Sequence, residues 1–133
     1  MADALFGKNW KLDPGRTIFS TAFTPAQETR LYEDLPNGYK LTVNGVHNGT
    51  PYQWGYTAFY DGQPHPVYGR ADLDSITAYR IDDKITIGFF SQKGVDGGAY
   101  ARKLSDDGKT LSIQAAGRDA SGKPYYDVIT YTA

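Results

Sequence analysis

Tight-turn dipeptides recur along this chain at short, even intervals, and they limit every structural element between them to a few residues. They fall at Asn37-Gly38, Asn48-Gly49, Asp61-Gly62, Asp96-Gly97, Asp107-Gly108 and Ser121-Gly122. Asx-Gly pairs supply the positive φ that tight hairpin turns need. The segments between the turns are about six to ten residues long, which is the spacing of an antiparallel β-meander.

The segments between the turns are predicted to be strands, because they are rich in aromatic residues and alternate apolar with polar positions. The chain contains 11 Tyr, 6 Phe and 2 Trp. The predicted strands cover 9–13, 28–34, 39–46, 52–61, 65–68, 75–81, 84–93, 98–104, 110–117 and 125–132. Residues 14–27 include two prolines and lack a helical apolar period, so we expect at most one short turn there.

Closure of the sheet follows from the number of strands. An open sheet of this size exposes two edges and one apolar face, and a barrel removes both problems. Tyr39, Leu41 and Val43 share one face of their strand, and Leu111 and Ile113 share one face of theirs. The predicted fold is all-β, a single antiparallel up-and-down β-barrel of about 8–10 strands. It forms one domain over residues 1–133, and a two-sheet sandwich is the alternative.

Charge and cysteine content exclude several classes of function. Lys and Arg number 14 against 15 Asp and Glu, so the chain lacks the basic excess of a nucleic-acid-binding protein. It has no cysteine, and its two histidines do not have zinc-ligand spacing. It also has no apolar run long enough for a membrane span and no visible signal peptide. We expect a cytoplasmic protein without metal, cofactor, nucleic-acid or membrane partner.

Three motifs point to a family. The chain has Leu5-Phe6-Gly7-Lys8-Asn9-Trp10-Lys11-Leu12 near its start, the hairpin Asp106-Asp107-Gly108, and Asp127-Val128-Ile129-Thr130-Tyr131 near its end. These motifs resemble the first strand, a hairpin and the last strand of the lipocalin and fatty-acid-binding-protein (calycin) superfamily. The spacing of Gly7 and Trp10 is one residue longer than in that family, and Ile129 stands where fatty-acid-binding proteins carry an anchoring arginine. The resemblance implies a lipocalin-like barrel with a small-molecule ligand inside.

The candidate ligand-binding residues are mostly aromatic. They are Tyr52, Trp54, Tyr56, Tyr60, Phe89 and Tyr100. The four on the strand at 52–61 project to one side, and rings with apolar bodies and polar tips suit a pocket for a small hydrophobic or aromatic molecule. The alternatives are that these rings form ordinary core, or an outer face through which the chain forms a homodimer.

The candidate catalytic residues are His47, Arg102 and Asp127. His47 lies on the face of Leu41 and Val43, where an imidazole can act as general acid or base, or else it is an exposed turn residue before Asn48. Arg102 shares a face with Tyr100 and Leu104. If that face is internal, its guanidinium needs a partner, and Asp127 or an anionic ligand is the candidate. The opposite parity places Arg102 in solvent.

Two functions are compatible with these residues. The first is binding of a small hydrophobic or aromatic molecule in the barrel cavity. The alternative is a cofactor-independent isomerase, cyclase or lyase that transfers protons inside the barrel, since the chain lacks a Gly-x-Ser-x-Gly elbow and a phosphate-binding glycine loop. A structural module with a filled core is a third option.

Overall fold

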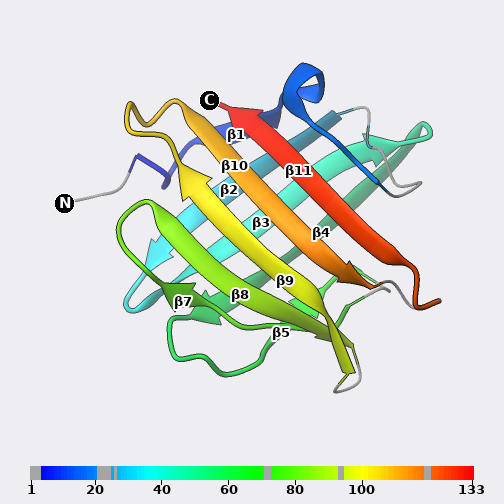
Figure 1. Ribbon diagram of the computed structural model, residues 1–133. Helices are drawn as coiled ribbons and strands as arrows, with labels where there is room; N and C mark the ends of the chain where they lie inside the picture. Colours follow the sequence, from blue (N-terminus) through cyan, green and yellow to red (C-terminus); the bar gives the residue numbers. More distant parts are fainter. Residues whose placement is uncertain (1–3, 21–24, 26, 71–72, 93–94, 119–120) are drawn as a thin grey trace.

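The computed structural model describes residues 4–20, 25, 27–70, 73–92, 95–118 and 121–133, and these residues form an all-β structure (Figure 1). The strands are β1 (Asn9–Leu12), β2 (Gln27–Leu35), β3 (Gly38–His47), β4 (Thr50–Phe59), β5 (His65–Tyr68), β6 (Ser75–Ile76), β7 (Tyr79–Arg80), β8 (Ile85–Gln92), β9 (Val95–Leu104), β10 (Thr110–Arg118) and β11 (Pro124–Thr132). One turn of 3-10 helix, η1 (Pro14–Arg16), follows β1. No helix in the described ranges is long and apolar enough to cross a membrane.

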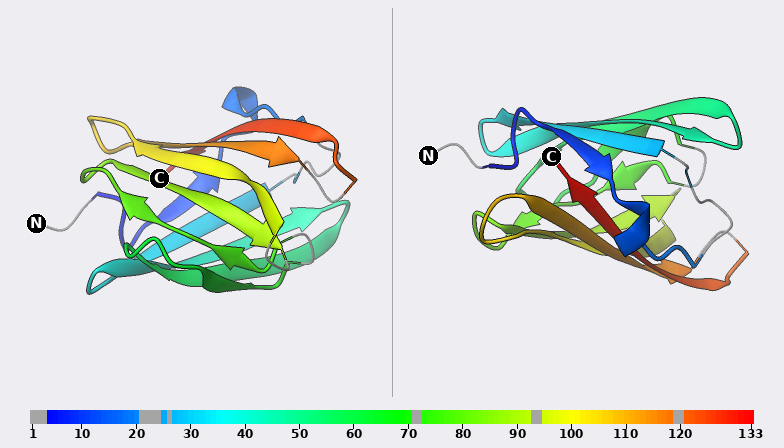
Figure 2. Two further views of the ribbon diagram at one scale, coloured as in Figure 1. Left: turned by 60° about the horizontal axis from the view of Figure 1, so that its bottom comes forward. Right: turned by 90° about the horizontal axis from the view of Figure 1, so that it is seen from above.

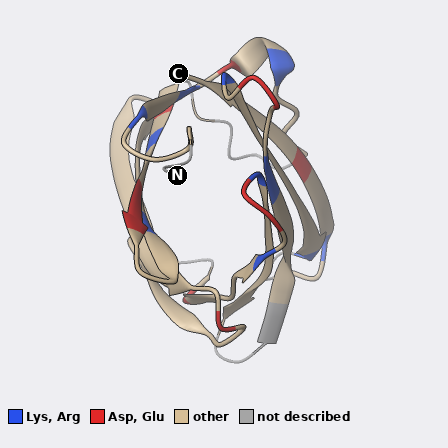
Figure 3. Ribbon diagram, turned by 90° about the vertical axis from the view of Figure 1, so that its left-hand side faces the viewer, with Lys and Arg blue, Asp and Glu red and all other residues tan. Residues whose placement is uncertain are grey.

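The strands form one sheet that closes on itself. Their order is β6-β5-β4-β3-β2-β1-β11-β10-β9-β8-β7, and β6 also pairs with β8. The short strands β6 and β7 both pair with β8, at different positions along it, so they occupy one place in the wall. The barrel therefore has ten strands around its wall. In the view along the barrel, the strands enclose a ring (Figure 3). The predicted antiparallel up-and-down barrel is therefore confirmed.

The two ends of the barrel carry different turns. The end that we call the Asn37 end holds the turns after β2, β7 and β9, the C-terminus and the described N-terminal residues (Figures 1 and 2). There Leu5 is buried, and the indole nitrogen of Trp10 donates a hydrogen bond of 2.9 Å to its carbonyl. The opposite end, the Asn48 end, holds the turns after β3 and β10. Asn37 and Asn48 both adopt positive φ, as the predicted turns require.

Three long strands each place one alternating face inside the barrel, and on β9 this decides between the two orientations that the sequence left open for Arg102. On β3, Tyr39, Leu41 and Val43 are fully buried. On β4 the aromatic face that starts at Tyr52 points inward, and on β9 the face that includes Arg102 does so. The side chains on these faces pack together into one core inside the barrel.

The prediction that Phe89 binds a ligand inside the barrel is wrong, because β8 presents its other face to the interior. Phe89 is 51% exposed, and the opposite face, with Thr86 and Gly88, is buried. A side chain at Gly88 would collide with the Thr77 carbonyl and would begin 2.7 Å from the Tyr100 ring. Only a glycine fits this inward position, and the period of two then places Phe89 on the outside. Phe89 therefore does not line the interior.

Candidate functional site

Two arginine side chains lie inside the barrel, and they are the feature that most needs an explanation. Arg30 on β2 is 8% exposed and Arg102 on β9 is 5% exposed. A buried guanidinium is costly unless it is paired and hydrogen-bonded. Glu28 is the one acidic side chain that is buried in the part of the chain that the structure describes.

Glu28 belongs to Arg30. The two residues are two positions apart on β2, so they share its inward face, and Arg30 Nε donates to Glu28 Oε1 at 3.0 Å. The Tyr131 hydroxyl donates to the same oxygen, and the Tyr52 hydroxyl donates to Oε2 at 2.6 Å. Burial alone would raise the pKa of Glu28, but the Arg30 charge and these hydrogen bonds outweigh burial and hold that pKa below its usual value.

Aromatic rings complete the surroundings of Arg30. Its guanidinium lies 5.0 Å from the centre of the Tyr131 ring and 5.3 Å from that of Trp54. Arg70, from the segment after β5, lies 4.6 Å from the centre of the same Trp54 ring. Cations over aromatic faces are attracted by the ring quadrupole. Arg30 therefore has both a carboxylate and aromatic partners.

Arg102 has aromatic partners but forms no ion pair with any described carboxylate. Its guanidinium lies 4.7 Å from the ring centres of both Tyr32 and Tyr39. Nη2 donates to the Thr86 hydroxyl at 3.0 Å. The other terminal nitrogen, Nη1, is buried and has no hydrogen-bond partner among the described residues. An arginine cannot lose its proton in a protein, so this site holds an uncompensated positive charge.

A cluster of tyrosine rings surrounds Arg102. The Tyr39 ring lies 5.7 Å from Tyr32, 5.7 Å from Tyr56 and 5.9 Å from Tyr60, and the hydroxyls of Tyr39 and Tyr56 are 2.8 Å apart. Burial raises the pKa of Tyr56 and of Tyr100, so both phenols keep their protons at neutral pH. The cluster offers ring faces for stacking together with neutral hydroxyl groups.

An open hollow of about 410 Å³, which we call the rim pocket, lies at the Asn37 end. Its lining residues are Phe6, Asp34, Leu35, Asn37, Tyr60, Arg80 and Ile81. Tyr60 connects this pocket with the tyrosine cluster, since it packs on Tyr39. Burial raises the pKa of Tyr60, and the nearby Arg102 guanidinium opposes that rise.

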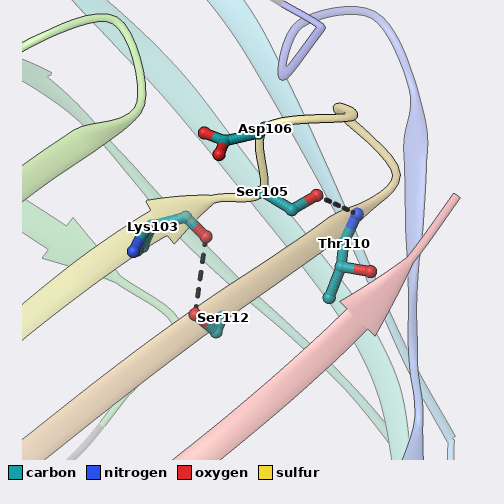
Figure 4. A pocket seen from close by; sticks show the side chains of 5 residues that line it. All are labelled: Lys103, Ser105, Asp106, Thr110 and Ser112. Carbon is teal, nitrogen blue, oxygen red and sulfur yellow. Dashed lines mark hydrogen bonds between the residues drawn. The ribbon is translucent and has the colours of Figure 1, made fainter.

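A second hollow, of about 320 Å³, lies on the hairpin between β9 and β10 (Figure 4). Ser105 Oγ accepts the Thr110 amide proton at 3.0 Å, and Ser112 Oγ donates to the Lys103 carbonyl at 3.5 Å. Asp106 accepts a hydrogen bond from Lys84 at 2.8 Å. None of the residues that line this hollow is among the described residues with a buried polar atom that lacks a hydrogen-bond partner, so the hollow gives no sign of a missing ligand.

The structure places five of the six predicted ligand-binding residues on inward faces. Trp54, Tyr56 and Tyr100 are buried, Tyr52 and Tyr60 are half-buried against the core, and Phe89 is the exception described above. The five do not form one site. Tyr52 and Trp54 belong to the surroundings of Arg30, whereas Tyr56, Tyr60 and Tyr100 surround Arg102.

The three predicted catalytic residues are not brought together. His47 lies eight residues beyond Tyr39 on β3, roughly 26 Å along the strand, and its ring contacts Asn48 at the Asn48 end. The Asp127 carboxylate accepts hydrogen bonds from the amide and hydroxyl of Ser20, at 2.9 and 3.2 Å. Of the three, only Arg102 contacts the tyrosine cluster.

The prediction missed Glu28, Arg30, Tyr32 and Tyr39 as site residues. A signal existed in the alternation Glu28-x-Arg30-x-Tyr32, because opposite charges two positions apart on a strand share a face with the ring that follows.

Within the described ranges, no group of three or more His, Cys, Asp or Glu side chains is arranged to hold a metal ion. No protein-family model, no curated protein and no solved structure matches this chain.

Proposed function

We propose that this protein binds a small apolar or aromatic molecule in the rim pocket, against Tyr60 and the tyrosine cluster behind it. The observation that carries the proposal is that one side chain, Tyr60, is both a wall of the pocket and part of the buried cluster. A ligand in the pocket is therefore in reach of stacking surfaces.

The size and lining of the rim pocket support this proposal. Small-molecule sites usually measure about 300–1,000 Å³ and combine apolar walls with a few polar groups. The rim pocket, at about 410 Å³, has apolar walls from Phe6, Leu35 and Ile81, and its polar groups come from Asp34, Asn37, Tyr60 and Arg80, so that its lining contains one carboxylate and one guanidinium. Leu35 and Arg80 belong to β2 and β7 of the closed wall, whereas Phe6, Asn37 and Ile81 lie outside the strands.

The same proposal places the chain among lipocalin-like binding proteins of the cytoplasm. The closed antiparallel barrel supports the lipocalin-like part of this proposal, as does the buried Trp10 of the first strand. We favour binding over proton-transfer catalysis. A general acid or base must reach the reacting atom within hydrogen-bond distance, and His47 lies at the other end of the barrel from Arg102.

A neutral apolar dye tests the proposal, and two isoleucines provide matched variants. N-phenyl-1-naphthylamine is expected to bind saturably at one site per chain, with a rise in its fluorescence. Ile81→Glu places a charge in the pocket wall and removes an apolar contact of the dye. We expect binding to weaken at least about 10-fold, which corresponds to a loss of about 1.4 kcal/mol in binding free energy. Ile87→Glu makes the same change on the outer wall and is expected to have no effect.

The dye experiment has two outcomes that would contradict the proposal. The first is the absence of saturable binding to the wild-type protein. The second is an equal loss of binding in the two variants, which would place the dye outside the rim pocket.

A further inference from the structure

We infer that Arg102 binds the acidic group of the ligand, and that the ligand is a compact aromatic acid. This inference rests on the proposed function, because it names the chemical class of the molecule that occupies the rim pocket. It is carried by the one buried guanidinium nitrogen, Arg102 Nη1, that has no partner among the described residues.

The charges buried in the barrel leave one position for an anion. Arg30 and Arg102 bring two positive charges, and Glu28 brings one negative charge that is already engaged by Arg30, Tyr52 and Tyr131. A carboxylate at Arg102 would compensate the remaining charge. It would also accept the unused hydrogen bond of Nη1, and charge-assisted hydrogen bonds of this kind are the strong ones.

The contacts of Arg102 restrict where this anion binds. The rings of Tyr32 and Tyr39 lie against the guanidinium, so these sides are occupied. Nη2 already donates to Thr86, which leaves the edge of the guanidinium at Nη1. Arg102 does not itself line the rim pocket, but Tyr60 does, and Tyr60 packs on Tyr39, one of the two rings against the guanidinium. The acidic group would therefore reach Arg102 from the rim pocket, past Tyr60.

The packing around Arg102 favours a compact aromatic acid over a long-chain one. Tyr32 and Tyr39 are at most 1% exposed and Tyr56 is 5% exposed, and neighbouring rings are in contact. A long alkyl chain would have to displace several of these close-packed rings. A flat aromatic ring instead fits between the apolar walls of the rim pocket and stacks against Tyr60.

Isothermal titration calorimetry with an acid and its amide tests the inference on the wild-type protein. We expect 2-naphthoate to bind about 10- to 100-fold more tightly than 2-naphthamide, which is the effect of one hydrogen bond to a charged group. Hexadecanoate is expected to leave bound 2-naphthoate in place. Arg102→Met should remove the preference for the acid, and Lys103→Met, which deletes a neighbouring exposed cation on the same strand, should retain it.

The outcomes separate this inference from the proposed function. Equal affinity of wild-type protein for acid and amide would overturn the role of Arg102 and leave small-molecule binding intact. Displacement of 2-naphthoate by hexadecanoate would overturn the compact ligand. Failure of both naphthyl compounds and of the neutral dye would overturn the proposed function itself. The acid–amide comparison needs no variant, so it decides the matter even where Arg102→Met does not fold.

Discussion

Arg30 and Arg102 are the same residue type, equally buried in one barrel, yet only Arg30 is paired with a carboxylate. Glu28, Tyr52 and Tyr131 complete the surroundings of Arg30, and Arg102 has two rings, one hydroxyl and an unused nitrogen. A buried charge whose partners come from the chain itself is part of the fold. A buried charge that lacks such a partner lowers the stability of the fold, and its presence is explained if a ligand supplies the opposite charge.

The largest expected effect comes from breaking the complete pair. Glu28→Gln leaves Arg30 buried without its carboxylate, and we expect it to lower the free energy of unfolding by about 3–5 kcal/mol. Urea denaturation monitored by circular dichroism measures this loss. A loss below about 1 kcal/mol would show that Arg30 does not depend on Glu28, and the contrast between the two arginines would disappear.

Acid should remove the same contribution. The pKa of folded Glu28 lies below its ordinary value of 4.5, so ionised Glu28 contributes its full stability above pH 4.5. That contribution is lost as the pH falls through the lowered pKa of the folded protein. The stability difference between wild-type protein and Glu28→Gln should therefore be constant near neutral pH and shrink below pH 4.5. A difference that stays constant down to pH 2 would rule out Glu28 as the source.

Arg102→Met should have the smallest effect on stability. The methionine keeps an apolar stem and removes a charge that has no carboxylate partner, while the Thr86 hydroxyl loses one hydrogen bond. We expect the free energy of unfolding to change by less than about 1 kcal/mol in ligand-free protein. A loss as large as that of Glu28→Gln would make Arg102 a structural residue and would weaken its assignment as a binding group.

The features that were predictable from the sequence are those set by local alternation and turns. Alternating rings predicted the inward face of β4, and Asn48-Gly49 predicted a tight hairpin. The error on β8 has a different origin. The Thr77 carbonyl and the Tyr100 ring leave room only for a glycine at position 88, on the inward face. Both groups belong to other parts of the chain, so the sequence around Phe89 does not reveal them.

The candidate site was predictable only in part for a similar reason. The sequence placed Arg102 on one face with Tyr100 but left open whether that face points inward. Its neighbours Tyr32 and Tyr39 come from strands across the barrel. The register between strands decides such contacts, and one sequence does not show it. The expected grouping of His47 with Arg102 failed because strand length places His47 at the far end.

The central claim is that Arg102 is open to an anion and Arg30 is not, and one titration compares both in the same sample. In protein labelled with ¹⁵N-arginine, the Nε–Hε resonance of each guanidinium is followed by NMR as 2-naphthoate is added. We predict a saturable shift of the Arg102 resonance and a nearly constant position for Arg30. A shift of Arg30 with Arg102 unchanged, or no shift of either at saturating 2-naphthoate, would contradict the claim.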